Sequence, residues 1–180
     1  MKALIIVDPQ NDFITGTLPV PGAEKAMRDL ASRLGEFPVQ HIFVTMDCHP
    51  FRHMSFEEEG GIWPVHCVKY SGGAAVEPVL MEALRMCGDK TVHFIEKGTL
   101  RDREAYSAFE ESYPSLLDEA DEIFVTGLAG DVCVQTSIKD LVRHGLADKL
   151  TVVQKYCPSL DGGKLLSETA GELGLKISGF

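Results

Sequence analysis

The chain has 180 residues, 44% of them hydrophobic, and a formal net charge of −10 at pH 7. This length suits one domain, so we expect residues 1–180 to form a single domain, and the hydrophobic content excludes a disordered chain. The acidic balance and the lack of any Lys/Arg run argue against nucleic acid or an anionic membrane surface as a partner.

Targeting signals and disulfides are not expected either. The apolar run at 3–7 is too short for a signal peptide, and no stretch approaches the length of a membrane span. Five cysteines make an odd count without CxxC spacing, which argues against a disulfide framework or a Cys-only zinc site. A cytoplasmic location is therefore expected.

Strand and helix patterns alternate along the chain. Apolar runs typical of buried strands occur at 3–7, 39–45, 91–95, 123–125, 150–154 and 175–177. Helical spacing occurs at 23–34, 77–86, 115–120, 134–142 and 163–173. This alternation predicts an α/β protein: a doubly wound, Rossmann-like, mainly parallel six-stranded sheet with helices on both faces. Any doubly wound fold, flavodoxin-like included, would give the same pattern, so it decides no function.

Cys133 lies at the start of the expected helix at 134–142. Asp131 is the expected N-cap, and Gly145 stands where this helix should end. The unpaired N–H groups and the dipole of a first helical turn favour an anion, so we expect a lowered pKa for the Cys133 thiol. The alternative is that Cys133 is simply a small buried apolar residue.

Reactive side chains follow four strands. Asp8, Asp47 and Lys97 come at or just after three of them, and Cys133 follows the fourth. Each alone is more often a turn or surface residue, but ligands of open α/β sheets bind beyond the carboxyl ends of the strands. Asp8, Lys97 and Cys133 would supply a base, a cation and a thiol nucleophile. The loop at 128–130 could turn backbone N–H groups toward an oxyanion.

A second group of polar residues occupies the long loop at 47–73. Asp47, His49, His53 and His66 fall within twenty residues, and this donor set suits zinc, iron or manganese. A polar loop with solvated histidines is the alternative. Histidines elsewhere in the chain are expected to be structural.

Three aromatic residues accompany these loops. Phe13, Trp63 and Tyr106 would suit a flat ring as substrate, although each taken singly is more often a packing residue.

Together these residues resemble the isochorismatase-like cysteine hydrolases, in their nicotinamidase/pyrazinamidase branch. The matching motifs run in the family order at 7–13, 47–56, 63–68, 97–99, 104–109, 127–129 and 131–134. Two positions depart from the pattern: Gly130 stands where many members have threonine, and Val132 where Tyr, Phe or His is usual.

The resemblance implies a metal-dependent nicotinamide amidohydrolase of NAD salvage, which converts nicotinamide and water to nicotinate and ammonia and also acts on pyrazinamide. Asp8 would deprotonate Cys133 and later protonate the departing ammonia, while Lys97 positions and polarises. Cys133 would form a thioester. The backbone N–H groups of Ala129 and Cys133 would form the oxyanion hole, after a cis peptide at Leu128–Ala129.

The resemblance also implies the binding residues. Asp47, His49 and His66 would bind a divalent metal, zinc first, with iron and manganese as alternatives. His53 would be a fourth ligand, as in some members, or an outer neighbour, as in others. The side chains expected to wall the pyridine ring are Phe13, Trp63 and Tyr106. The oligomeric state, with a homo-oligomer as one option, stays open.

Two other functions compete with this one. A cysteine hydrolase of the same fold could act on another small amide or carbamoyl substrate, although many such relatives lack the metal loop. A non-catalytic doubly wound binding module would have neither a reactive cysteine nor a metal.

Overall fold

Runs of buried apolar residues form the central sheet of the computed structural model, which describes residues 1–179. The strands are β1 (Lys2–Val7), β2 (His41–Asp47), β3 (Thr91–Lys97), β4 (Glu122–Gly127), β5 (Leu150–Val153) and β6 (Lys176–Ser178). They pair in the order β3-β2-β1-β4-β5-β6, and every neighbouring pair is parallel. The predicted α/β fold with a doubly wound six-stranded sheet is confirmed.

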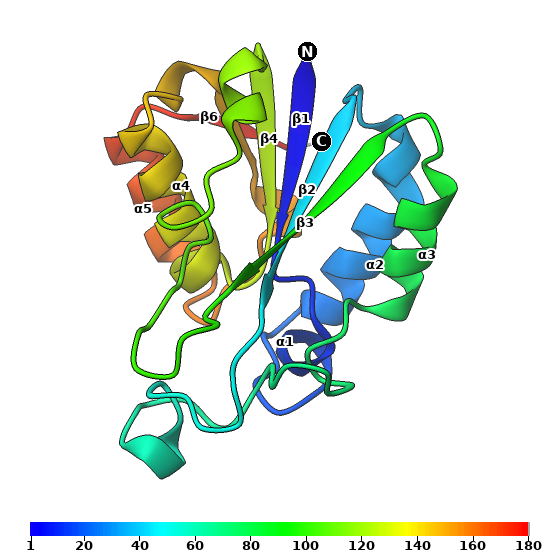
Figure 1. Cartoon of the computed structure of the whole chain (residues 1–180). Coiled ribbons are helices and arrows are strands. Elements are labelled where there is room, and N and C mark those ends of the chain that lie inside the picture. Colours follow the sequence, from blue (N-terminus) through cyan, green and yellow to red (C-terminus); the bar gives the residue numbers. More distant parts are fainter. Residues whose placement is uncertain (180) are drawn as a thin grey trace.

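Helices cover both faces of this sheet. They are α1 (Asn11–Ile14), α2 (Ala23–Arg33), α3 (Pro78–Met86), α4 (Gln135–Arg143) and α5 (Lys164–Glu172). Figure 1 shows α2 and α3 on one face, α4 and α5 on the other, and α1 below the ends of the strands. Side chains of β1 alternate between the two layers: Leu4 and Ile6 pack in the core under α2 and α3, whereas Ala3, Ile5 and Val7 pack in the core under α4 and α5.

Short helical turns complete the chain. Five are 3-10 turns: η1 (Leu34–Glu36), η2 (Glu57–Glu59), η3 (Ser115–Glu119), η5 (Ala147–Lys149) and η6 (Gln154–Tyr156). The sixth, η4 (Gly130–Val134), is a π-helical turn that leads directly into α4. Across residues 1–179, helices long and apolar enough to cross a membrane are absent.

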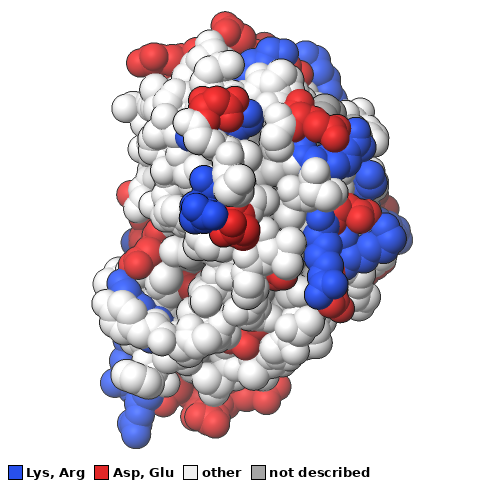
Figure 2. Space-filling model, turned by 90° about the vertical axis from the view of Figure 1, so that its right-hand side faces the viewer, with Lys and Arg blue, Asp and Glu red and all other residues white. Residues whose placement is uncertain are grey.

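The surface on the side of α2 and α3 carries many basic side chains that lie next to acidic ones. Figure 2 shows basic and acidic side chains next to one another around a largely uncharged centre. Ion pairs within these two helices account for part of this pattern: Lys25–Asp29, Arg28–Glu24 and Arg85–Glu82. Exposed pairs of this kind contribute little to stability.

The structure corrects several expected boundaries. β2 begins at His41 rather than at Val39, because its pairing with β1 starts at Ala3 opposite His41. The turn after β1 contains the short helix α1, which its polar residues did not indicate. Asp131 does not cap its own helix: its carboxylate accepts hydrogen bonds from the N–H groups of Leu160 and Asp161, both at 3.0 Å.

The strand ends meet at one edge of the sheet. Asp47 lies opposite Lys97 in the β2–β3 pairing, and Val7, just before Asp8, lies opposite Gly127 in the β1–β4 pairing. The chain runs outward from β1 in both directions, so the gap between β1 and β4 is the switch point where such sheets bind ligands.

Candidate active site

Lys97 stands at the centre of a buried charged group. Its ammonium nitrogen lies 2.9 Å from Asp8 Oδ2, 2.5 Å from Asp47 Oδ1 and 3.7 Å from Cys133 Sγ. It also donates a hydrogen bond to the carbonyl oxygen of Ala105 at 3.1 Å. Asp8, Asp47 and Cys133 each place one reactive atom within 4.8 Å of the others. The carboxyl ends of β1, β2 and β3 and the η4 turn therefore converge, as expected.

The charges in this group depend on one another. Burial opposes the charge of Lys97, but the carboxylates of Asp47 and Asp8 outweigh it and hold the pKa of Lys97 well above its ordinary value. Burial raises the pKa of Asp8, against the lowering effect of Lys97. A charged ammonium between two carboxylates avoids an uncompensated buried charge.

The expected lowering of the Cys133 pKa is wrong. Burial raises the pKa of this thiol well above its ordinary value, and the carboxylates of Asp8 and Asp47 add to the rise, while Lys97 lowers it. The helix start cannot compensate for complete desolvation beside two acids. A thiol with a raised pKa would need a base to act as a nucleophile.

Asp8 is held in the position of such a base. Its backbone has a φ of 46°, and its Oδ1 accepts a hydrogen bond of 2.7 Å from the hydroxyl of Thr45 on β2. Its Oδ2 touches the Lys97 ammonium but accepts no well-aligned hydrogen bond within the described chain. That oxygen can accept a proton from a neighbouring thiol.

The segment before Cys133 has the expected cis peptide bond at Leu128–Ala129. The carbonyl oxygen of Ala129 accepts hydrogen bonds from the N–H groups of Val132 and Val134, both at 3.1 Å, which closes the π turn. Over residues 1–179, no acceptor is found for the N–H of Ala129 itself. An unpaired N–H next to a nucleophile is the type of donor that an oxyanion hole requires.

Gly130 is enforced by its neighbours. A Cβ atom at this position would lie 2.2 Å from the Ser159 hydroxyl oxygen and 2.6 Å from the Cys157 carbonyl oxygen. A residue with a side chain at this position would therefore require a shift of the 157–159 segment.

Asp47, His49 and His66 form a buried group that suits a metal. Their ligand atoms lie within 4.8 Å of one another. His49 Nδ1 lies 2.9 Å from the carbonyl oxygen of Gly98, and His66 Nδ1 lies 2.7 Å from that of Pro64. Because a carbonyl only accepts, both Nδ1 atoms carry the proton and both Nε2 lone pairs are available.

The protonation state of His49 also suits a ligand. Burial lowers its pKa to about 3, so the ring is neutral at physiological pH. Two neutral imidazoles and one carboxylate are the donors that zinc and related divalent ions prefer. The residues present therefore fit a divalent metal.

His53 lies beside this group and does not offer it a free nitrogen. Its ring stacks on that of His49 with centroids 4.0 Å apart. Its Nδ1 lies 2.6 Å from Ser55 Oγ, and its Nε2 lies 3.0 Å from the carbonyl oxygen of Arg103. Of the two roles that the resemblance allows, this geometry favours the outer neighbour.

Gln10 clamps the backbone of Asp47. Its side-chain oxygen accepts from the Asp47 N–H at 2.8 Å, and its side-chain nitrogen donates to the carbonyl oxygens of Asp47 at 2.7 Å and Ala74 at 2.8 Å. Glycine is also required at position 98. The backbone φ there is +62°, and a Cβ atom would lie 2.5 Å from His49 Cε1. No local pattern of residues predicts either role.

A cavity joins the two groups. The three predicted ring-binding residues line it, together with Asp47, His49, His66, Ala129 and Cys133. Trp63 Nε1 donates a hydrogen bond of 3.0 Å to the Tyr106 hydroxyl, and the Phe13 ring lies 5.5 Å from that of His66. Five further lining residues had not been assigned to the pocket: Leu18, Val20, Glu104, Val132 and Leu160.

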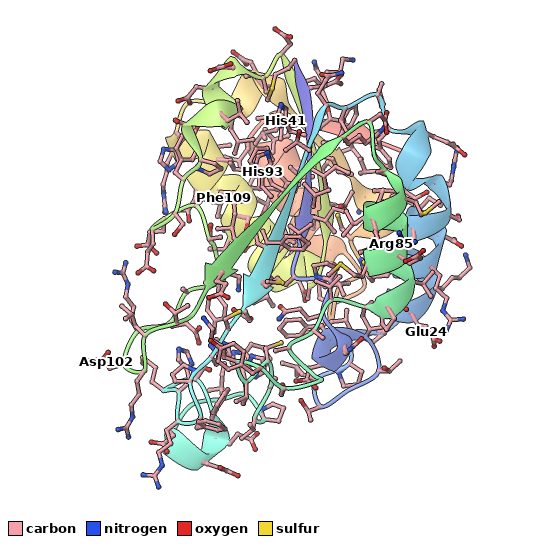
Figure 3. All side chains as sticks on the ribbon, turned by 45° about the vertical axis from the view of Figure 1, so that its right-hand side comes forward. Glu24, His41, Arg85, His93, Asp102 and Phe109 are labelled. Atoms are coloured by element: carbon pink, nitrogen blue, oxygen red, sulfur yellow. The ribbon has the colours of Figure 1, made fainter. Side chains whose placement is uncertain are left out.

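The histidines outside the loop lie elsewhere. His41 and His93 are on the neighbouring strands β2 and β3, with His41 Nδ1 3.1 Å from His93 Nε2. Figure 3 shows both residues far from the carboxyl ends of the strands, where the candidate site lies. His144 Nε2 lies 3.0 Å from the carbonyl oxygen of Phe109. These contacts fit the structural roles expected for them.

The fold and the side-chain group define a class: a doubly wound α/β protein with an acid, an ammonium and a thiol at the carboxyl edge of its sheet, beside a metal-type group. The sequence matches the isochorismatase domain family over residues 2–164. The chain therefore belongs to the isochorismatase family, as its motifs predicted.

Two relatives show which members it resembles. The chain is 30% identical to the nicotinamidase of Saccharomyces cerevisiae over 96% of this chain and 95% of that protein. It is 36% identical to the nicotinamidase/pyrazinamidase of Mycobacterium tuberculosis over 84% of each. Among solved structures, the pyrazinamidase of Pyrococcus horikoshii in complex with zinc matches with a TM-score of 0.82 at 31% identity, covering 99% of both chains.

Proposed function

We propose that this protein is a metal-dependent nicotinamidase, which hydrolyses nicotinamide to nicotinate and ammonia and also accepts pyrazinamide. One observation carries the proposal. The Lys97 ammonium contacts both Asp8 and Cys133. The same ammonium contacts Asp47, whose carboxylate also lies beside His49 and His66. A thiol centre and a metal-type group thus border one cavity, and similarity to nicotinamidases over almost the full chain supports the substrate.

In the proposed first half-reaction, the thiol attacks the carboxamide carbon. The proton of Cys133 passes to Asp8 as the sulfur–carbon bond forms, because the thiol is neutral at rest. The negative charge that develops on the carboxamide oxygen is received by the N–H groups of Ala129 and Cys133. Asp8 then returns its proton to the amide nitrogen, the C–N bond breaks, and ammonia leaves a thioester behind.

In the second half-reaction, water hydrolyses the thioester. Asp8, again a carboxylate, takes a proton from water as the water oxygen bonds to the acyl carbon. The tetrahedral intermediate collapses with the carbon–sulfur bond breaking, and the proton on Asp8 passes to the Cys133 sulfur. The acid product loses its remaining proton to solvent and leaves as nicotinate. Lys97 holds Asp8 in place through both halves and favours its ionised form before each proton transfer.

Asp47, His49 and His66 would hold the divalent metal, for which we propose zinc. When bound, a metal of this kind supplies an electrophilic site that can orient a ring nitrogen, directly or through water. Phe13, Trp63 and the residues around them would stack against the ring faces. The zinc complex of the similar pyrazinamidase supports this choice of metal.

The direct test is ammonia release from nicotinamide by the purified protein. Cys133→Ala should lose turnover by at least about 10⁴-fold, since it removes the nucleophile. Cys87→Ala, which removes another buried thiol at the end of α3, serves as the matched control and should keep normal turnover. Turnover by Cys133→Ala would remove the proposed nucleophile. Wild-type protein that leaves nicotinamide intact but hydrolyses other amides or carbamoyl compounds would favour the rival substrate class.

The metal is tested by analysis and reconstitution. We expect purified protein to carry close to one zinc ion per chain, and a chelator to abolish turnover that added zinc restores. Iron or manganese as the sole restoring ion would reject zinc but keep the metal group. Full activity after complete metal removal would reject the metal dependence.

We also propose one functional domain and a cytoplasmic location. A single sheet carries every strand end of the site, which supports the first. All five cysteines are buried and free, which suits a reducing compartment. The oligomeric state stays open.

A further inference from the structure

Glu104 lines the same cavity, and the proposed reaction gives it no task. It belongs to the lining with Tyr106, Ala129 and Cys133, and its side chain is half-buried. Its Oε1 accepts a hydrogen bond of 3.0 Å from the N–H of Ala105. The other side of that residue, its carbonyl oxygen, accepts the bond from Lys97. The Glu104 carboxylate is therefore tied to the backbone that supports the catalytic lysine.

The described chain places no cation against this carboxylate. The arginine that precedes it, Arg103, pairs instead with Glu110 at 3.3 Å and Glu111 at 2.7 Å. The pKa of Tyr106 is raised chiefly by burial, and the charges of Glu104 and Cys133 both add to the rise. The charge of Glu104 therefore acts on the same part of the pocket as Cys133. An unpaired carboxylate in a ligand cavity acts on the charge of whatever binds there.

The proposed reaction changes that charge. Nicotinamide is neutral in its carboxamide, whereas nicotinate is a carboxylate at neutral pH. Two carboxylates (Asp8 and Asp47), one ammonium (Lys97) and a divalent ion carry a net charge of +1, which would attract the nicotinate anion and slow its release. The negative charge of Glu104 brings this net charge to zero. We infer that Glu104 is a selectivity residue that disfavours the carboxylate product relative to the neutral amide substrate, and so speeds product release. This inference rests on the proposed function.

The test compares binding of both ligands to zinc-loaded protein that cannot turn over. In the Cys133→Ala background, Glu104→Gln removes the charge and keeps an oxygen for the Ala105 N–H. We expect the Kd for nicotinate to fall roughly fivefold or more, and the Kd for nicotinamide to change by less than about twofold, because only the anion feels the lost repulsion. Isothermal titration calorimetry measures both.

Asp102→Asn is the matched control. It removes one carboxylate two residues away, and Figure 3 shows Asp102 at the outer tip of this loop, pointing away from the body of the protein. We expect no change for either ligand. Glu104→Asp, which keeps the charge, should keep the discrimination and guards against a folding defect in the glutamine variant.

Equal changes for both ligands, or an unchanged nicotinate Kd, would overturn the inference. Steady-state assays of Glu104→Gln in the otherwise native enzyme give a second readout, since nicotinate should become a stronger product inhibitor. Failure of the proposed function is distinguishable, because wild-type protein would then not hydrolyse nicotinamide at all.

Discussion

The two halves of the pocket are held in different ways. Asp8, Lys97 and the start of η4 stand on the ends of paired strands, where the register of the sheet fixes their backbone. His49 and His66 lie in the connection between β2 and α3, which has only the short turn η2. Asp47 belongs to both halves, because it ends β2 and touches both Lys97 and His49.

This difference has a physical consequence. The strand-end half is held by the whole sheet and by compensated buried charge, so damage to it should affect the stability of the fold. The loop half is held by single hydrogen bonds and close backbone approaches, so damage to it should release metal or substrate while the fold survives. The predictions below separate the two cases.

The largest effect is expected from Lys97→Met. Removing the ammonium leaves two buried carboxylates facing each other, so we expect a loss of about 3–5 kcal/mol in the free energy of unfolding. Turnover of nicotinamide should fall by at least about 10³-fold. Urea denaturation and an ammonia assay measure the two effects.

Lys69→Met is the control for that change. Lys69 forms an exposed pair with Glu96 at 2.5 Å, so its loss should leave the free energy of unfolding nearly unchanged. Near-equal stability of both variants would contradict the view that the strand-end half depends on buried charge compensation.

The next effect tests the loop half. Gly98→Ala would push against His49 from a backbone with positive φ, so we expect zinc affinity to fall about 10- to 100-fold. Gly35→Ala, where a Cβ would meet open space, is the control. A competition titration with a chelating dye measures the affinity. If Gly98→Ala binds zinc normally, the close approach at His49 is not needed.

The two halves also differ in how far the sequence predicts them. Ends of buried apolar runs located Asp8, Lys97 and Cys133, because a parallel sheet brings its strand ends to one edge whatever the loops do. The same strand ends located Asp47, and the donor residues of the loop at 47–73 predicted a metal group of Asp47, His49, His53 and His66. The motif resemblance then assigned Asp47, His49 and His66 as ligands, with His53 as a fourth ligand or an outer neighbour. These residues all fall in one pocket or beside it.

The contacts that support them were not predictable from local patterns. Gln10 acts on Asp47, 37 residues away, and Leu160 lines the pocket from the loop between η6 and α5. The Cys133 pKa was predicted with the wrong sign, because local helix geometry indicates a dipole but not the burial that outweighs it. Long-range packing decides these features, and short windows of sequence do not report it.

A smaller effect is expected where the halves are joined. Gln10→Met leaves the N–H and carbonyl groups of Asp47 without their side-chain partner, which should cost about 1–3 kcal/mol of stability. Zinc affinity should fall roughly tenfold as the Asp47 carboxylate loses its fixed position. Gln40→Met is the control, since Gln40 makes one exposed bond to the Lys2 N–H. Lower stability with unchanged zinc affinity would show that Gln10 supports the fold alone.

The smallest effect is expected at the wall of the pocket. Tyr106→Phe keeps the ring but removes the acceptor of the Trp63 indole N–H, a partly buried bond of 3.0 Å. The KM for nicotinamide should rise about 3- to 10-fold with kcat within roughly twofold, because a wall residue contributes equally to substrate and transition state. Tyr70→Phe, at a side chain that is 95% exposed, is the control. A fall in kcat at constant KM would instead place the phenol among the groups that act on the reacting atoms, and the division between a catalytic strand-end half and a binding loop half would then no longer hold.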